Sequence, residues 1–166
     1  AGSPVWRYDH SMKSPRITAP SDLTYNSYLK VPELLSLQVP KTDPAHHDEM
    51  LFIIIHQAYE LWFKLILHEL ANAIRYMDED RVLRARHFVH RVVEIFRLLI
   101  PQIHVLETMT PAEFQRFRHV LNPASGFQSI QFREVEFIAG LKQERYLKFF
   151  KNDPEGHGRL VRRLEE

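Results

Sequence analysis

Histidines are the first residues in this chain whose chemistry suggests a site, because there are ten of them and no cysteine. Imidazole binds metals and exchanges protons near neutral pH, whereas the lack of cysteine excludes disulfides, thiolate metal sites and thioether-attached haem within this sequence. His68-Glu69 begins a zinc-protease pattern, but Asn72 stands where the second histidine would be. Spacing alone therefore names no metal site. Four histidines are expected to be polar surface residues of helices: His87, His90, His104 and His119.

His56 differs from these because aromatic residues flank it at helical spacing. Phe52 precedes it by one turn, and Tyr59 and Phe63 follow on the same face. Such a residue is either a core histidine satisfied by a hydrogen bond, or a histidine in an aromatic pocket that donates to or accepts from a buried ligand. Spacing alone leaves both interpretations open.

Arg118 is a second candidate, one helical turn after Phe114. An arginine beside an apolar residue at the mouth of a pocket suits a ligand that has a carboxylate and an apolar tail. A surface ion pair is the alternative. The following segment NPASG, residues 122–126, is either a simple turn or a place where small residues let the backbone approach a flat ligand closely.

The elements that must position these residues are helices. Asp43-Pro44 predicts a helix start, with Asp43 as the cap and proline at the first position. Apolar residues three or four apart continue to about Met77, and they cover much of the circumference, as in a central helix. A second helix is expected over 81–103, with Pro101 near its end. The sequence thus predicts an all-α fold, a helical bundle built around a long central helix of about residues 44–77.

Shorter helices are expected before and after this pair. Thr110 and Glu113 form a capping-box pattern with Pro111 at the first position, which predicts a helix to about Leu121. Four more helices are expected at 32–38, 127–140, 144–150 and 154–164. Residues 1–22 contain three prolines and no apolar period, so we expect a flexible N-terminal arm, followed by one all-helical domain over 23–166.

Composition narrows the functional class. The chain is 45% hydrophobic and 26% charged, which favours a packed soluble protein. A net charge of +1 argues against a nucleic-acid partner. No run of about 18 apolar residues and no secretory signal are visible, so no membrane association is expected and a cytoplasmic location is the default.

Four segments of the chain resemble, in order and spacing, the tryptophan 2,3-dioxygenases. They are LTYNSYLK, HHDEMLFIIIHQAYELWFKLILHEL, VLETMTPAEFQRFR and PASGFQSIQFR, and the resemblance covers about residues 23–165. It implies an all-α homotetrameric oxidoreductase with non-covalent haem b (iron protoporphyrin IX). Such an enzyme opens the indole ring of L-tryptophan with O2 to give N-formylkynurenine, the first step of tryptophan catabolism by the kynurenine pathway.

The resemblance also implies roles for individual residues, taken by motif position. His56 would be the distal residue over the haem that faces the indole N–H, Phe52 would line the indole pocket, and Arg118 would pair with the substrate carboxylate. Phe114 stands where family members carry Tyr or Phe and would make apolar contact only. The remaining implied residues are, at the haem edge, Ser125 and Gly126 and, reaching into a neighbouring subunit's site, Tyr25, Tyr28 and Leu29.

One departure from the family pattern concerns the haem iron. None of the ten histidines matches the motif of the proximal ligand, which is expected beyond residue 166. Two alternative functions therefore stay open. A related haem-dependent aromatic oxygenase could act on a modified tryptophan, and the number of oxygen atoms in the product separates it. A catalytically empty helical interaction module would show no haem absorption band in a titration.

Overall fold

The structure is a computed structural model that describes residues 22–165. Within that range the chain forms eight α-helices, two short 3₁₀ helices and no strand, which confirms the all-α class. The chain divides after Leu37 into two compact units, and each is described by itself. Residues 1–21 of the expected N-terminal arm lie outside the described residues.

The described part of the first unit contains α1, Tyr25–Leu29, and α2, Val31–Leu35. Thr24 begins α1 with a reciprocal cap, in which its hydroxyl accepts from the N–H of Ser27 and the Ser27 hydroxyl accepts from the N–H of Thr24. The sequence predicted α2 but not α1. A five-residue helix that buries no side chain has no apolar period to reveal it.

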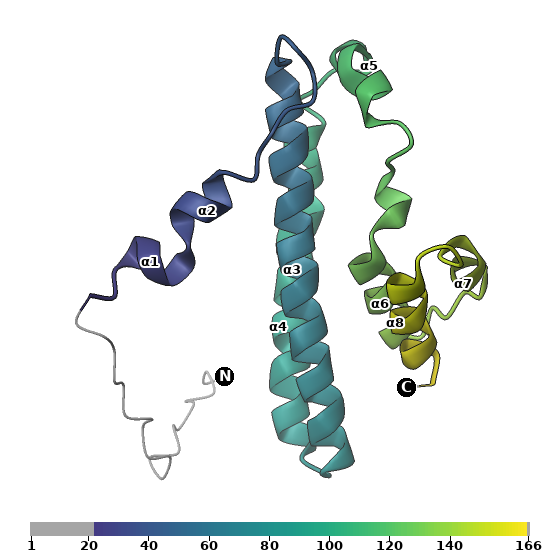
Figure 1. The fold of residues 1–166 in the computed structure, drawn as a ribbon. Coiled ribbons are helices and arrows are strands. Elements are labelled where there is room, and N and C mark those ends of the chain that lie inside the picture. Colours follow the sequence, from purple (N-terminus) through teal and green to yellow (C-terminus); the bar gives the residue numbers. More distant parts are fainter. Residues whose placement is uncertain (1–21, 166) are drawn as a thin grey trace. The chain divides into compact units, whose positions relative to one another are not determined.

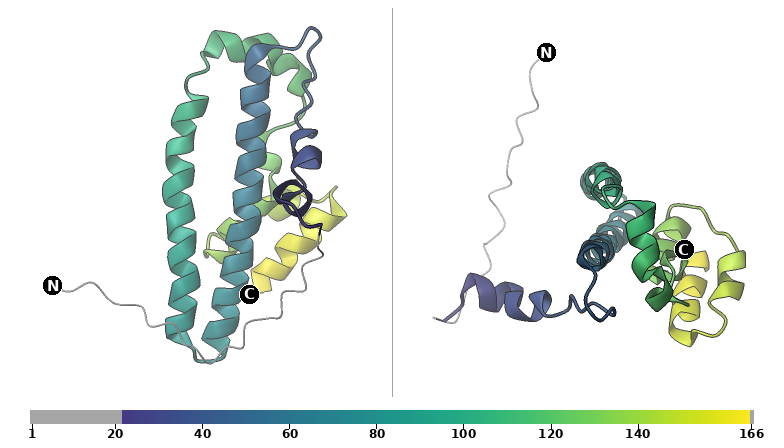
Figure 2. Two further views of the ribbon diagram at one scale, coloured as in Figure 1. Left: turned by 90° about the vertical axis from the view of Figure 1, so that its left-hand side faces the viewer. Right: turned by 90° about the horizontal axis from the view of Figure 1, so that it is seen from above.

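The second unit is built on a pair of long antiparallel helices, α3 (His47–Asp78) and α4 (Val82–Leu106) (Figures 1 and 2). This confirms the predicted central helix and its partner. Side chains three and four positions apart on each helix meet in one apolar core, as helical periodicity requires. The buried residues of that core include Phe63, Ile66 and Leu67 of α3 and Val92, Ile95 and Leu99 of α4.

The predicted cap of α3 at Asp43 is wrong. The helix begins at His47, and its cap is His46, whose Nδ1 accepts from the N–H of Asp48. Thr42 explains the difference. Its hydroxyl accepts from the N–H of His46 at 2.7 Å, and this hydrogen bond holds the preceding loop against the helix end. The chain therefore turns once more before it becomes helical.

Glu49, in the first turns of α3, is fully buried and holds the same loop. Its carboxylate accepts from the N–H of Lys41 at 2.6 Å, and from the N–H and hydroxyl of Thr42 at 3.1 and 2.5 Å. Burial by itself raises the pKa of Glu49, but these hydrogen bonds outweigh it and lower the pKa below its usual value. The ionised carboxylate thus pins the loop before α3 to the helix.

Pro101 lies inside α4, and the helix runs on to Leu106, three residues past the predicted end. Proline removes one backbone donor, and the carbonyl that loses it belongs to Arg97, four residues earlier. Arg97 is exposed, so water can satisfy that carbonyl. The helix therefore tolerates proline at this position.

The capping box at Thr110 is confirmed and opens α5, Pro111–Arg118, which continues as a 3₁₀ turn at His119–Leu121. The helix predicted over 127–140 is split in two. A 3₁₀ turn, Gly126–Gln128, precedes α6, Ile130–Ile138, because the Ser129 hydroxyl accepts from the N–H of Phe132 and starts a new helix.

Two further helices complete the second unit, α7 (Arg145–Phe149) and α8 (Pro154–Glu165). A second apolar cluster of Phe137, Phe150 and Leu160 joins them to α6. Seen from above, α3 lies between α4 and the group formed by α6 and α8 (Figure 2). The α3 helix therefore packs against α4 on one side and against α6 on another.

Among the described residues, α3 is the one helix long and apolar enough to span a membrane by length and composition alone. The central helix of a soluble protein meets the same criterion. Here α3 packs against α4, α5 and α6. It also carries the buried Glu69, whose carboxylate accepts from the guanidinium of Arg91 at 2.9 and 3.0 Å.

Candidate functional site

A cavity of about 470 Å³ lies between α3, α4 and the start of α6, and most of its lining is apolar. Positions 56, 59 and 63 of α3 line it because residues three and four apart share one helical face. The lining that defines its chemistry consists of His56, Tyr59 and Phe63 of α3, Leu99 and Ile103 of α4, and Gly126 of the turn before α6. His56 is the one histidine among them.

The hydrogen bond of His56 fixes which of its ring nitrogens can meet a ligand. Nδ1 lies 2.7 Å from the carbonyl oxygen of Phe52, one turn earlier on α3. A carbonyl only accepts, so Nδ1 carries the proton, and Nε2 of the neutral ring is left as an acceptor. Both interpretations of His56 from the sequence thus hold together. Its Nδ1 is hydrogen-bonded to a carbonyl of its own helix, and its ring still lines a cavity.

Two hydrogen bonds between helices set the shape of the cavity. The Tyr59 hydroxyl donates to the carbonyl of Leu99 at 2.8 Å, and burial raises the pKa of Tyr59, so the hydroxyl remains a donor. On the other side, the amide of Gln131 donates to the carbonyl and the carboxylate of Glu60 at 2.9 and 2.7 Å. The sequence placed Tyr59 on the face of His56 but gave no sign of these hydrogen bonds or of Glu60 and Gln131, because the partners are far apart in the chain.

A row of aromatic rings connects His56 to α5. The Phe52 ring lies 4.0 Å from the His56 ring and 5.7 Å from the Phe114 ring, measured between centroids. Phe117, which is fully buried, meets Phe52 edge-on at 5.7 Å and anchors α5 on α3. The guanidinium carbon of Arg118 lies 6.0 Å from the Phe114 centroid. Four predicted site residues therefore form one continuous strip.

Arg118 ends α5 and is exposed. Its guanidinium forms no ion pair with any carboxylate of residues 22–165, so the surface ion pair considered from the sequence is not made there. Arginine is always protonated and presents a fork of donors to a carboxylate. The strip thus ends in a positive charge that is available to an anionic group.

The turn that follows α5 brings backbone to the cavity. Ser125 caps the 3₁₀ turn, because its hydroxyl accepts from the N–H of Phe127 at 3.3 Å and its own N–H donates to Gln128 at 2.9 Å. Gly126 lines the cavity, whereas Ser125 does not. A Cβ atom built at Gly126 would meet no atom within 4 Å, so the space beside it is open to a ligand.

Arg133 also contacts this turn, through the ring of Phe127. The sequence patterns did not identify Arg133 as part of the site. It is only 5% exposed and its guanidinium lies 4.2 Å from the Tyr146 ring, 4.9 Å from the Phe132 ring and 5.8 Å from the Phe127 ring. Nη1 donates to Glu136 at 2.5 Å. The cation therefore connects the turn to α6 and to Tyr146 of α7.

The first unit carries the three residues that the family resemblance assigned to a neighbouring subunit. Tyr25, Tyr28 and Leu29 lie on α1 and are 75%, 72% and 45% exposed. Large aromatic side chains this exposed are typical of contact surfaces.

The cavity fits one side of a flat apolar cofactor such as haem. It provides apolar walls, an open backbone position at Gly126 and one imidazole, that of His56, and its other polar lining residues are Tyr59, Glu60 and Ser129. No group of three or more His, Asp or Glu side chains converges on a metal position within residues 22–165. The lining residues thus suit the contact face of a haem.

Comparison with known proteins agrees with this geometry. The model of the family Tryptophan 2,3-dioxygenase matches residues 10–162. The tryptophan 2,3-dioxygenase of Xanthomonas oryzae pv. oryzae is 50% identical over 143 residues, which cover 86% of this chain and 48% of that protein. The Nocardioides sp. enzyme of the same name is 52% identical over 151 residues, which cover 88% and 57%. The chain thus spans about half the length of the curated relatives it matches.

Proposed function

Because the chain belongs to the tryptophan 2,3-dioxygenase family, we propose that it forms the distal half of a site that opens the indole ring of L-tryptophan with O2, giving N-formylkynurenine. The strip from His56 through Phe52 and Phe114 to Arg118 carries this proposal. It presents an acceptor, an apolar surface and a cation in the order in which L-tryptophan presents an N–H, an aromatic ring and a carboxylate.

Arg118 binds the carboxylate of the substrate in this proposal. A guanidinium gives two parallel charge-assisted hydrogen bonds, which fix the orientation of the carboxylate as well as its position. Phe114 and Phe52 pack against the rest of the molecule. Holding the substrate at both ends places the indole ring in one orientation, and orientation of this kind is a large part of many catalytic rate enhancements.

His56 receives the indole N–H at Nε2. The neutral ring accepts this hydrogen bond because Nδ1 is already committed to the carbonyl of Phe52. The indole proton stays on its nitrogen, so His56 positions the substrate and does not act as an obligatory base. The Tyr59 and Glu60 hydrogen bonds to α4 and α6 keep the helix in place around it.

The proposed cofactor is haem b, held without a covalent bond, since this sequence has no cysteine for a thioether. When bound, the haem supplies the redox chemistry that activates O2. The chain contributes the apolar wall, the close backbone approach at Gly126 and the His56 side chain on the distal side.

The proposed assembly is a cytoplasmic homotetramer, with Tyr25, Tyr28 and Leu29 contributing to a neighbouring subunit's site. The exposure of these side chains and the absence of buried residues in α1 support this part of the proposal. Deleting residues 1–30 should weaken tryptophan binding while the second unit stays folded. Unchanged affinity would count against a shared site.

The experiment that tests the function uses the intact protein loaded with haem, L-tryptophan and ¹⁸O₂. We expect a product that is heavier than tryptophan by two ¹⁸O atoms, with the indole ring opened. A product with one added oxygen would favour a related aromatic oxygenase. Failure of the intact protein to bind haem, seen as the lack of a haem absorption band, would favour a helical interaction module.

A further inference from the structure

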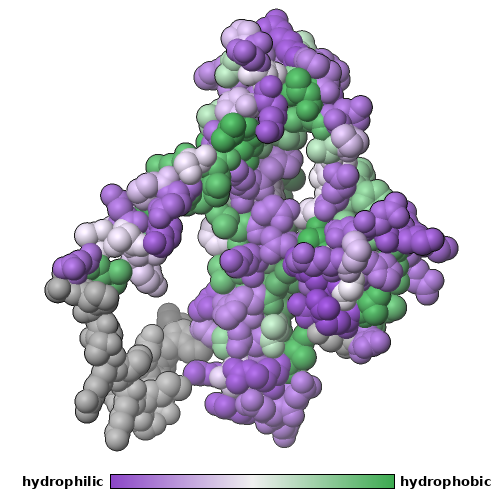
Figure 3. Space-filling view, viewed as in Figure 1, coloured by the Kyte–Doolittle hydropathy of each residue, from purple (hydrophilic) through white to green (hydrophobic). Residues whose placement is uncertain are grey.

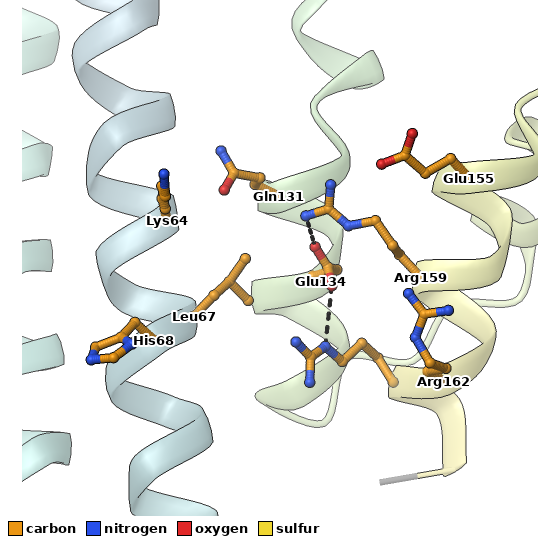
Figure 4. Close-up of a pocket in the computed structure, with 9 residues that line it drawn as sticks. Lys64, Leu67, His68, Gln131, Glu134, Glu155, Arg159 and Arg162 are labelled. Atoms are coloured by element: carbon orange, nitrogen blue, oxygen red, sulfur yellow. Dashed lines mark hydrogen bonds and ion pairs between the residues drawn. The ribbon is translucent and has the colours of Figure 1, made fainter.

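A second hollow, outside the proposed catalytic site, lies between α3, α6 and α8 and has a volume of about 700 Å³. Hydrophilic side chains dominate the face of the second unit on which α8 lies (Figure 3). Figure 4 shows Lys64 and His68 on α3 at one side, Arg159 and Arg162 on α8 at the other, and Glu134 of α6 between them. We call this hollow the charged cleft.

Glu134 forms the floor of the charged cleft and is 3% exposed. Its carboxylate pairs with Arg159 (Figure 4) and, at 3.2 Å, with Nε of Arg163. A buried carboxylate between two arginines restricts the positions that both guanidinium groups can take. Arg159 donates one N–H to Glu134, and a guanidinium has five. The pairing with Glu134 therefore holds Arg159 in place and leaves its other N–H groups free to donate to another acceptor.

The cleft has more positive than negative groups. Its lining contains four permanent cations and two carboxylates, those of Glu134 and Glu155. Arg159 and Arg163 are partly neutralised by Glu134, so the surplus lies on Lys64 and Arg162. Neither of these two side chains forms an ion pair or a hydrogen bond with another residue in the range 22–165. The chain as a whole is nearly neutral, with a net charge of +1, so this surplus is local.

We propose that the charged cleft binds the oxyanion group of a small molecule, a phosphate or a carboxylate, between Lys64 on α3 and Arg159 and Arg162 on α8. An ammonium and guanidinium groups on facing walls suit an anion that accepts hydrogen bonds on several sides. A recess between three helices fits a small molecule better than the long, evenly charged backbone of a nucleic acid. The proposal is independent of the proposed dioxygenase activity.

The test titrates the intact, haem-loaded protein with inorganic phosphate and, separately, with succinate, by calorimetry at constant ionic strength. We expect saturable binding of one anion per chain. Lys64→Ala and Arg162→Ala should each weaken it about tenfold, the loss expected for one charge-assisted hydrogen bond. The matched controls are Lys148→Ala and Arg86→Ala, which remove the same charges at exposed positions outside the cleft and should leave binding unchanged.

The two probes separate the two chemistries, since a site for phosphate esters should prefer phosphate and a site for carboxylates should prefer succinate. Non-saturable uptake of both anions, or an equal loss in the control variants, would show a diffuse charge effect and overturn the proposal. Circular dichroism of each variant verifies the fold. Tryptophan turnover measured on the same samples tests the catalytic proposal separately, because the cleft variants change none of its residues.

Discussion

The two hollows beside α3 are both built against α3 and α6 and have opposite character. In the cavity, Tyr59 and His56 direct hydrogen bonds to backbone carbonyls and the carboxylate of Glu60 accepts from Gln131, so most of the remaining wall is apolar. In the charged cleft, Lys64 and Arg162 keep their charges toward the hollow. One helix thus lines both hollows, because successive residues of an α-helix point in directions about 100° apart. Phe63 therefore faces the cavity and Lys64 faces the cleft.

This contrast has an energetic consequence. Electrostatic contacts are stronger where water is excluded, and weaker where solvent screens them. Arg118 is itself exposed, so this difference depends on the substrate displacing water when its indole ring packs on Phe52 and Phe114. A carboxylate held there is then more sensitive to the loss of one charge than an anion in the open cleft. The hydrogen bond from Gln131, which lines the cleft, to Glu60, which lines the cavity, is the direct link between the two.

The largest expected effect is at Arg118. Losing a charge-assisted contact that the bound substrate shields from water costs about 2–5 kcal/mol, so Arg118→Ala should lower kcat/KM for L-tryptophan roughly 30-fold to several-thousand-fold. Arg118→Lys should recover only part of it, since a point charge cannot reproduce the fork. Tryptamine, which lacks the carboxylate, serves as the control substrate. An equal loss for tryptamine and tryptophan in steady-state kinetics would contradict the carboxylate assignment.

Glu134→Ala should have the next largest effect, on stability. It leaves Arg159 and Arg163 without their buried partner, and the loss of hydrogen bonds to charged groups costs about 1.5–3 kcal/mol. Glu155→Ala is the matched control, because Glu155 lines the same cleft and forms no ion pair within residues 22–165. Urea unfolding measures both. Equal free energies of unfolding for the two variants would show that the ion pairs of Glu134 with Arg159 and Arg163 do not stabilise the protein.

Tyr59→Phe tests the frame of the cavity. It removes the hydrogen bond to Leu99 and should reduce the free energy of unfolding by about 1 kcal/mol. Tyr146→Phe is the control, since the Tyr146 hydroxyl makes only an exposed contact of 3.4 Å with Arg145. We also expect Tyr59→Phe to raise KM for tryptophan more than Tyr146→Phe does. A larger rise of KM in Tyr146→Phe than in Tyr59→Phe would show that the Tyr59 hydrogen bond does not hold the shape of the cavity.

The smallest effect concerns Glu49; it is present at neutral pH and is lost in acid. Its pKa is lower in the folded protein than in the unfolded chain, so its contribution is fully present above the ordinary glutamate pKa, about 4.3, and is lost as the pH falls below it. Unfolding measured at pH 7 and at about pH 3.5 should therefore show a gap between wild type and Glu49→Gln that narrows in acid. A constant gap would mean that the charge of Glu49 does not stabilise the loop before α3.

Much of the fold follows from short-range sequence patterns. The apolar period of α3, the capping box of Thr110 and Glu113 and the break after Asp78 each depend on residues within about four positions of one another. The same range explains two errors. Asp43 satisfies the local rule for a helix cap, but Glu49 and Thr42 hold that loop through longer contacts. The short helix α1 was missed because it buries nothing.

For the site, the sequence alone identified His56, Phe52, Phe114 and Arg118 as candidates, because they stand in motifs that resemble a family. The tertiary structure decided how they are arranged and which groups hold them. Tyr59 and Leu99 are 40 positions apart, and Gln131 and Glu60 are 71 apart. Periodicity and capping act between residues one helical turn apart, whereas these hydrogen bonds form only after the helices have packed. The same packing gathers Lys64, Glu134 and Arg162 from three helices, and for that reason the charged cleft had no signature in the sequence.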